Sequence, residues 1–233
     1  LLFQDTSALD SQIAELDAAI RVERARLSQL RAGSSLEEIE IVSSNVEGAG
    51  VALESAETNL TIAKQAVVDA LKSTYTIAED GVKNKADKLF TNPNSNDPRL
   101  LFQSSNFLLG NELEAMRVGV GKELKELSKE VSGLSVDSDL SGKITAIRKR
   151  VEAVKVFLEK TSQYTVSVET LPSALLQTSF EVTKAELTQA KNAINSSLSQ
   201  ITQAQATLTQ TTSVKASAKT TLTTVNRQLE QVK

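Results

Sequence analysis

The sequence contains no cysteine and no histidine among its 233 residues. Without them there is no thiol or imidazole nucleophile, no histidine general base, and no zinc site built on sulfur or imidazole ligands. Most familiar enzyme mechanisms are excluded with these side chains. We therefore predict a protein that is not an enzyme and that holds no metal ion and no cofactor.

Aromatic side chains are also scarce. They make up 3% of the residues, with no tryptophan, and the chain has three prolines. Sheet proteins usually draw on aromatic and β-branched residues and on frequent turns, whereas Ala, Leu, Ser, Gln, Glu and Lys dominate here. The composition predicts an all-α fold.

The chain has neither a strong excess of one charge nor a long hydrophobic run. Its formal net charge is −3, with both signs interspersed, so we expect no nucleic-acid partner. Nowhere do 18 apolar residues follow one another, and no basic segment precedes an apolar one. We expect no membrane insertion within these residues; any signal or anchor would lie outside them.

One long helix, over residues 35 to about 90, organises the predicted fold. It opens with a capping box in which the Ser35 hydroxyl accepts the N–H of Glu38. Small and apolar residues then recur in strict three-four alternation, which is typical of a coiled-coil seam. The seam comprises Ile39, Val42, Val46, Ala49, Leu53, Ala56, Leu60, Ala63, Val67 and Ala70. After Ala70 it moves over by one position, as expected where a helix changes partners.

A shorter helix precedes the long one and ends at Gly33, a residue suited to the left-handed position after a helix. Its apolar stripe comprises Leu9, Ile13, Leu16, Ile20, Leu27 and Leu30. From Leu30 to Ile39 a continuous helix would rotate by about 900° and turn its seam to the opposite face. We therefore favour a reversal at Gly33, with the first helix beside the start of the second.

A loop over residues 91–106 interrupts the helices, because Asn92-Pro93 and Asp97-Pro98 both disfavour helix before the proline. Two helices follow, over residues 109 to about 131 and 139 to about 170, and a last one over residues 174 to about 233. The last helix nearly matches the 35–90 helix in length. We predict an elongated antiparallel coiled coil or helical bundle of about five helices, one domain over residues 1–233, thickened at one end by residues 91–172.

The loop carries four apolar residues that are candidate partner contacts: Leu100, Leu101, Phe102 and Phe107. In one interpretation these side chains plug the open end of the bundle. In the other they form an exposed tip that binds a partner. The sequence leaves both open.

Residues 137–144 match the first eight positions of an EF-hand calcium loop. The twelfth position of such a loop is a bidentate glutamate, and here it is Arg148. Asp137 and Ser138 as helix N-caps explain the same residues. We predict no calcium site.

Residues 30–39, Leu-Arg-Ala-Gly-Ser-Ser-Leu-Glu-Glu-Ile, resemble the helix break of HlyD-type membrane fusion proteins, the periplasmic adaptors of efflux and secretion transporters. Those proteins commonly read Leu-Arg-Ala-Gly-Thr-Arg-Pro-Glu-Glu-Ile, so this chain departs from them at Ser34, Ser35 and Leu36. Residues 2–7 are similar to the exit from a lipoyl-like domain, which implies that residues 1–6 are the end of a strand. Residues 46–66, 75–93 and the final helix resemble an enlarged adaptor hairpin.

The resemblance implies a non-catalytic periplasmic or extracytoplasmic spacer, tethered to a membrane through parts outside these residues. Its expected partners are transporter and channel subunits and neighbouring adaptor copies, and its helix break involves Gly33, Ser35 and Glu38. Two alternatives stay open: a four-helix sensory ectodomain of a chemoreceptor or sensor kinase, and a purely structural coiled-coil scaffold. Membrane spans on both sides of the chain would indicate the sensor, and lipoyl-like β sequence would indicate the adaptor.

Overall fold

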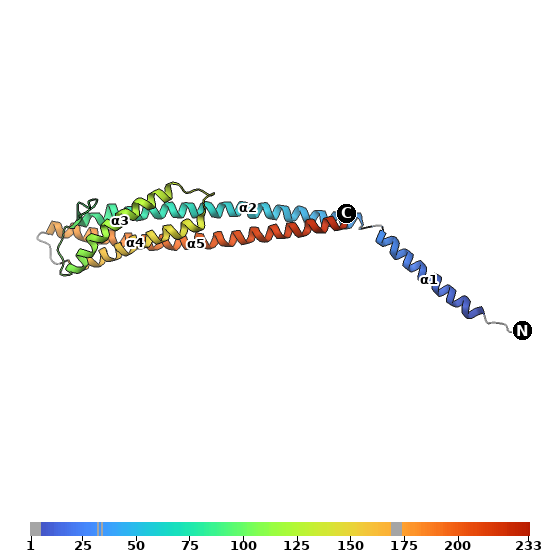
Figure 1. Ribbon diagram of the computed structural model, residues 1–233. Coiled ribbons are helices and arrows are strands. Elements are labelled where there is room, and N and C mark those ends of the chain that lie inside the picture. The colour runs from blue at the N-terminus through green and yellow to red at the C-terminus, as the bar shows by residue number, and fades with distance from the viewer. Residues whose placement is uncertain (1–5, 32, 34, 169–173) are drawn as a thin grey trace. The chain divides into compact units, whose positions relative to one another are not determined.

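The computed structural model describes residues 6–31, 33, 35–168 and 174–233. Over these residues the chain is an all-α helical bundle, as the composition predicted (Figure 1). Its helices are α1 (Thr6–Arg31), α2 (Leu36–Glu79), α3 (Phe107–Ser132), α4 (Leu140–Val166) and α5 (Ala174–Val232). The strand expected over residues 1–6 falls mostly outside the described residues, and Thr6 begins α1. In the described part of the chain, no helix has the length and apolarity needed to cross a membrane.

The chain divides into two compact units. The first comprises residues 1–56 and 215–233, and the second comprises residues 57–214. The second unit holds the main hydrophobic core, to which α2, α3, α4 and α5 all contribute. Figure 1 shows α3 and α4 lying alongside α2 and α5 in this unit. Its largest fully buried side chains include Leu71, Leu113, Ile147, Phe157 and Leu187.

Within the second unit, α2 and its continuation run antiparallel to α5. A Cβ at Gly81 would lie 3.4 Å from the Cβ of Ala190. Further along the chain, Lys88 pairs with Glu186 at 2.6 Å. Residue numbers therefore rise along one helix as they fall along the other, which confirms the predicted antiparallel arrangement in this unit.

The predicted seam of α2 matches the observed burial residue by residue. From Ile39 to Ala70 each seam residue is buried or half-buried, and nearly all the residues between them are exposed. The seam of α5 shows the same periodicity, with Phe180, Leu187 and Ile194 fully covered. Hydrophobic periodicity therefore identified both long helices correctly, because a three-four repeat can be covered only when the chain is helical.

The sequence predicted an α-helix that continues to about residue 90, but α2 ends at Glu79. After Glu79 the chain forms a π-helix, Asp80–Lys85, and then a 3₁₀ helix, Ala86–Leu89. The buried residues Ala78, Val82 and Ala86 are spaced by four, and repeated steps of four overshoot an α-helical turn of 3.6 residues. The wider turn of a π-helix keeps all three side chains on the core face.

Two predicted helix starts and one predicted end need correction. The N-cap of α4 is Asp139, whose carboxylate accepts the N–H of Gly142 at 3.3 Å, and not Asp137 or Ser138. This helix ends at Val166, four residues short of the prediction. At the start of α3, Asn106 is the cap and the helix begins at Phe107, two residues earlier than expected.

The first unit has far less buried surface. The parts of α2 and α5 that belong to it each present one half-buried stripe, with Ala49 and Ala56 buried. The sequence placed α1 against this end of α2, yet every described side chain of α1, over residues 12–28, is exposed. Its apolar residues Ile13, Leu16, Ile20 and Leu27 are 46–64% exposed. Among the described residues, the apolar stripe of α1 therefore does not pack against α2 as the sequence predicted.

Candidate functional site

The loop between the 3₁₀ helix and α3 is an ordered cap, which we define as residues 90–106. Two short strands, β1 (Phe90–Thr91) and β2 (Arg99–Leu100), pair antiparallel within it. Beyond them the N–H of Leu101 donates to the carbonyl of Leu89 at 2.9 Å. Asn92 begins the intervening turn with a φ of 52°, a left-handed conformation that asparagine tolerates better than most residues. The two prolines thus belong to a structured turn.

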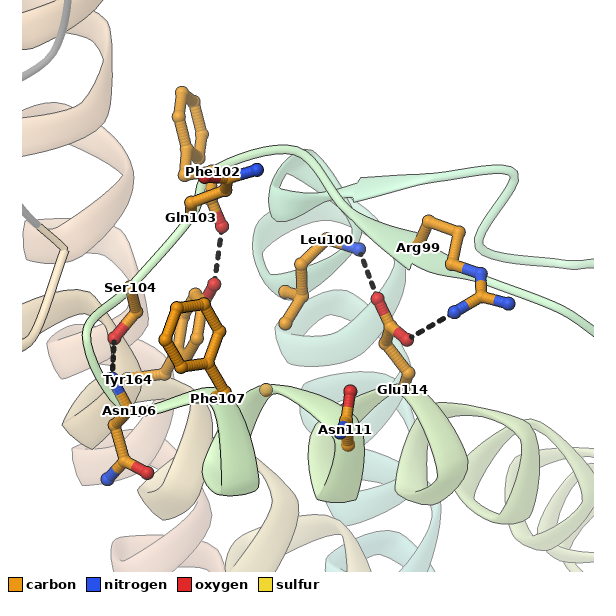
Figure 2. Close-up of a pocket in the computed structure, with 11 residues that line it drawn as sticks. Arg99, Leu100, Phe102, Gln103, Ser104, Asn106, Phe107, Asn111, Glu114 and Tyr164 are labelled. Carbon is orange, nitrogen blue, oxygen red and sulfur yellow. Dashed lines mark hydrogen bonds and ion pairs between the residues drawn. The ribbon is translucent and has the colours of Figure 1, made fainter.

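Side chains of α3 and α4 hold the cap in place (Figure 2). Glu114 of α3 accepts the N–H of Leu100 at 3.0 Å and pairs with the Arg99 guanidinium at 3.1 Å. From α4, the hydroxyl of Tyr164 donates to the carbonyl of Phe102. The hydroxyls of Ser104 and Ser167 lie 2.5 Å apart. These contacts link the cap to both inserted helices.

The cap ends at Asn106, whose side-chain oxygen accepts the N–H of Leu109 at 3.1 Å. As the N-cap of α3, Asn106 satisfies one of the free N–H groups at the start of that helix. It also places Phe107 and Leu108 in the first turn of the helix. The position of the N-cap therefore decides that these two apolar residues are helical.

The four apolar residues singled out by the sequence divide between the two interpretations. Leu100 and Phe102 are half-buried against the core, and the ring of Phe102 meets that of Phe180 at 5.0 Å, edge to face. Leu101 and Phe107 point to solvent, 53% and 71% exposed. Two of the residues close the bundle, and two are available to a partner.

The sequence reasoning missed Leu108, which is 84% exposed beside Phe107. The sequence did hold a sign of this exposure. The buried stripe of α3 begins with Leu109 and Leu113, and Phe107 and Leu108 do not fit the spacing of that stripe. Phe107 and Leu108 thus form an exposed apolar pair in the first turn of α3, and Leu101 is a further exposed apolar residue in the cap. Scattered apolar residues are normal on a protein surface, but two consecutive ones in the first turn of a helix are a stronger sign of a contact surface.

A cavity of about 260 Å³, which Phe107 helps to line, lies between the cap and the first turns of α3 (Figure 2). Polar side chains line much of it, among them Gln103, Asn106, Asn111 and Glu114. Burial raises the pKa of the Tyr164 phenol, and the nearby Glu114 carboxylate adds to the effect. The phenol is thus protonated at neutral pH and acts as a hydrogen-bond donor to the cap rather than as a base.

A second set of contacts holds the preceding segment. Arg117 of α3 donates from Nε and Nη2 to the two carboxylate oxygens of Asp87, at 2.5 and 2.8 Å, and from Nη2 to the side-chain oxygen of Asn94 at 3.3 Å. Its side chain is 3% exposed. Arg117 is therefore a buried charge on α3, and the neighbouring Met116 is partly buried against the core.

No family model, curated protein or solved structure matches this chain. The resemblance to HlyD-type adaptors therefore rests on the sequence motif alone.

The helix break that carries this similarity has the predicted local geometry. Gly33 adopts a φ of 70° directly after α1, the left-handed conformation that favours glycine. The Ser35 hydroxyl accepts the N–H of Glu38 at 3.2 Å, as the capping box requires. The end of one helix and the start of the next are thus confirmed, and the reversal of chain direction stays a prediction. Among the described residues, no group of three or more acidic side chains is placed to hold a metal ion.

Proposed function

We propose that the chain is the non-catalytic helical region of an HlyD-type periplasmic adaptor, a spacer that links transporter and channel subunits and packs against neighbouring copies. The observation that carries the proposal is the helix break at residues 31–38. Gly33, which this chain shares with the family motif, has the left-handed φ of 70°, and the shared Glu37 and Glu38 lie in the first turn of α2. The long paired helices α2 and α5 agree with the hairpin of such an adaptor.

Two exposed apolar surfaces support a role in assembly. The stripe of α1 has coiled-coil spacing, yet it is uncovered among the described residues, and an amphipathic helix of this kind is stable only when its apolar face is packed. The exposed apolar pair of Phe107 and Leu108 at the start of α3 is the second surface. A spacer that joins other subunits needs contact surfaces of this sort at separate places.

The decisive experiment is to determine the coding sequence on both sides of residues 1 and 233 in the parent gene. The adaptor proposal predicts the two β-rich halves of a lipoyl-like domain, one on each side. Hydrophobic spans directly before residue 1 and directly after residue 233 would overturn it and favour the sensory ectodomain.

A second experiment places a photo-crosslinking amino acid at Leu16 or Leu101 of the full-length protein in its own membranes. The adaptor proposal predicts cross-links from Leu101 to a channel or transporter subunit and from Leu16 to a neighbouring copy. The exposed position Thr221 on α5 is the matched control. Cross-links between copies alone, at all three positions, would contradict the proposal.

A further inference from the structure

The second unit contains another cavity, of about 550 Å³, which the buried Arg117 side chain helps to line. Its volume falls in the range of roughly 300–1,000 Å³ that is typical of small-molecule sites. It lies where the end of α2 and the π-helix face α3. Its lining includes Tyr75, Lys83, Arg117, Gly121, Leu124 and Lys125.

Arg117 presents an unused donor to this cavity. Its Nε and Nη2 atoms are taken by Asp87 and Asn94. Within the described residues, nothing accepts a hydrogen bond from Nη1. A Cβ built on Gly121 would lie 3.0 Å from Nη1, so this atom lies against the glycine that lines the cavity. A guanidinium buried on all sides but this one is preorganised for an oxyanion, because it forms planar, charge-assisted hydrogen bonds.

Cations outnumber carboxylates among the residues that line the cavity, although the chain as a whole is negative. Four cations line it, Lys83, Arg117, Lys125 and Lys129, and one carboxylate, Glu79. Glu79 is already bound to Lys83 at 2.6 Å, and Lys129 pairs with Glu126. Lys125 forms no ion pair in the part of the chain that the structure describes. The exposed ammonium group of Lys125 and Nη1 of the Arg117 guanidinium are therefore left for a ligand.

The floor of the cavity is apolar. Leu124 is buried and Tyr75 is half-buried, so a ligand that reaches Arg117 also covers these side chains. Lys83 stands on the π-helix Asp80–Lys85, and π-helical turns occur often at functional sites. We propose that this cavity binds a small organic anion, a carboxylate or phosphate on a compact apolar body, with its oxygens on Nη1 of Arg117 and Nζ of Lys125.

The proposal is independent of the adaptor function and is tested by calorimetric titration of the 233-residue chain with phenyl phosphate at low salt. We expect saturable binding of one molecule per chain, which weakens as salt is added. Inorganic phosphate should bind more weakly, because it covers no apolar surface, and neutral benzyl alcohol should not bind. Absence of phenyl phosphate binding at about 10 mM, or equal binding of benzyl alcohol, would overturn the proposal.

Substitutions locate the site. Lys125→Gln should lower the affinity about twofold to fivefold, the range that an exposed ion pair contributes, and Gly121→Ala should lower it as well by displacing Nη1. Lys122→Gln is the matched control, because it makes the same charge change on an exposed position of the same helix outside the cavity. The Lys substitutions leave the core untouched, so thermal midpoints should stay equal. An equal loss of affinity in Lys122→Gln and Lys125→Gln would contradict the assignment.

Discussion

Arg117 is the clearest case in which a single residue organises a part of this fold. Its charge is buried, and the carboxylate of Asp87 compensates it through two hydrogen bonds. A buried ion pair of this kind contributes little net stability, because desolvation offsets the attraction. Its effect is positional: it fixes the 3₁₀ helix and the turn at Asn94 against α3, and it aims the remaining guanidinium nitrogen at the cavity.

Removal of one partner of the Arg117–Asp87 ion pair should lower the free energy of unfolding far more than replacement of both partners. We expect Asp87→Ala to lower the free energy of unfolding by about 3–5 kcal/mol, because it leaves the Arg117 charge buried without a partner. The double variant Asp87→Leu, Arg117→Met should recover most of that loss. Urea unfolding measures both. A double variant as unstable as the single one would show that the pair itself, and not charge compensation, stabilises this region.

At the scale of elements, the π-helix links the end of α2 to the cap. The acidic residues where α2 meets the π-helix have local partners: the hydrogen bond from Lys83 lowers the pKa of Glu79, and that from Asn84, with a contribution from Lys85, lowers the pKa of Asp80. A carboxylate whose folded pKa lies below its unfolded pKa stabilises the fold fully above the unfolded value. That contribution is lost as the pH falls through the folded value.

We therefore expect the stability of the chain to decrease as the pH is lowered below about 4.5. The variant Glu79→Gln, Asp80→Asn should be less stable than the parent at neutral pH and should show a shallower decrease in acid. Urea unfolding at a series of pH values measures both slopes, with Glu47→Gln, an exposed position on the same helix, as the control. Identical slopes for the parent and the double variant would contradict this role.

The C-terminal half of α5 is helical in spite of its composition. Many of its threonine hydroxyls donate to the carbonyl four residues earlier, among them Thr209, Thr220 and Thr223. Threonine loses side-chain freedom in a helix, and this back-bonding slightly destabilises the helix. The segment therefore depends on its packing against α2 rather than on intrinsic propensity.

Replacement of exposed threonines by alanine should stabilise this helix. The triple variant Thr209→Ala, Thr220→Ala, Thr223→Ala is expected to gain about 0.3–0.7 kcal/mol at each position, seen as a higher thermal midpoint by circular dichroism. Thr183→Ala is the contrast, because Thr183 is buried on the same helix and its loss leaves a cavity. A lower midpoint for the triple variant would show that these hydroxyls form contacts that the helix needs.

At the scale of the whole molecule, stability is unevenly distributed between the two units. The core of residues 57–214 draws on four helices, whereas α2 and α5 in the other unit bury little more than Ala49 and Ala56. Regions with few buried apolar contacts open at lower free energy than the core. The exposed apolar stripe of α1 therefore belongs to the less stable unit.

Hydrogen exchange should reveal this difference directly. Amides at residues 144–158 of α4 should exchange slowest, those at residues 39–53 of α2 and 218–232 of α5 should exchange faster, and those of α1 fastest. Mass spectrometry of peptides from the exchanged protein measures all of these segments in one experiment. Uniform protection along α2, from residue 39 to residue 71, would contradict the prediction.

The part of the candidate site that sequence reasoning found is the part with a local signal. Phe107 and Leu101 were recognisable as apolar residues in a proline-containing loop, and the capping box at Ser35 was readable from four residues. Arg117 was not recognisable, because its charge argued against burial and its partner Asp87 lies 30 residues away. The extent of exposure at Leu108 depended on where Asn106 would cap the helix.

The sequence by itself determined the all-α class, the seams of α2 and α5, and the break at Gly33, because periodicity and capping act between residues three or four positions apart. Only the tertiary structure decided that α2 widens into a π-helix, that Leu100 and Phe102 cover the core while Leu101 and Phe107 do not, and that Arg117 faces a cavity. The last two depend on contacts between segments that are distant in the chain, and such contacts leave no period in the sequence. The π-helix does follow a four-residue spacing of buried residues, but that spacing also fits an α-helical seam until the packing is known.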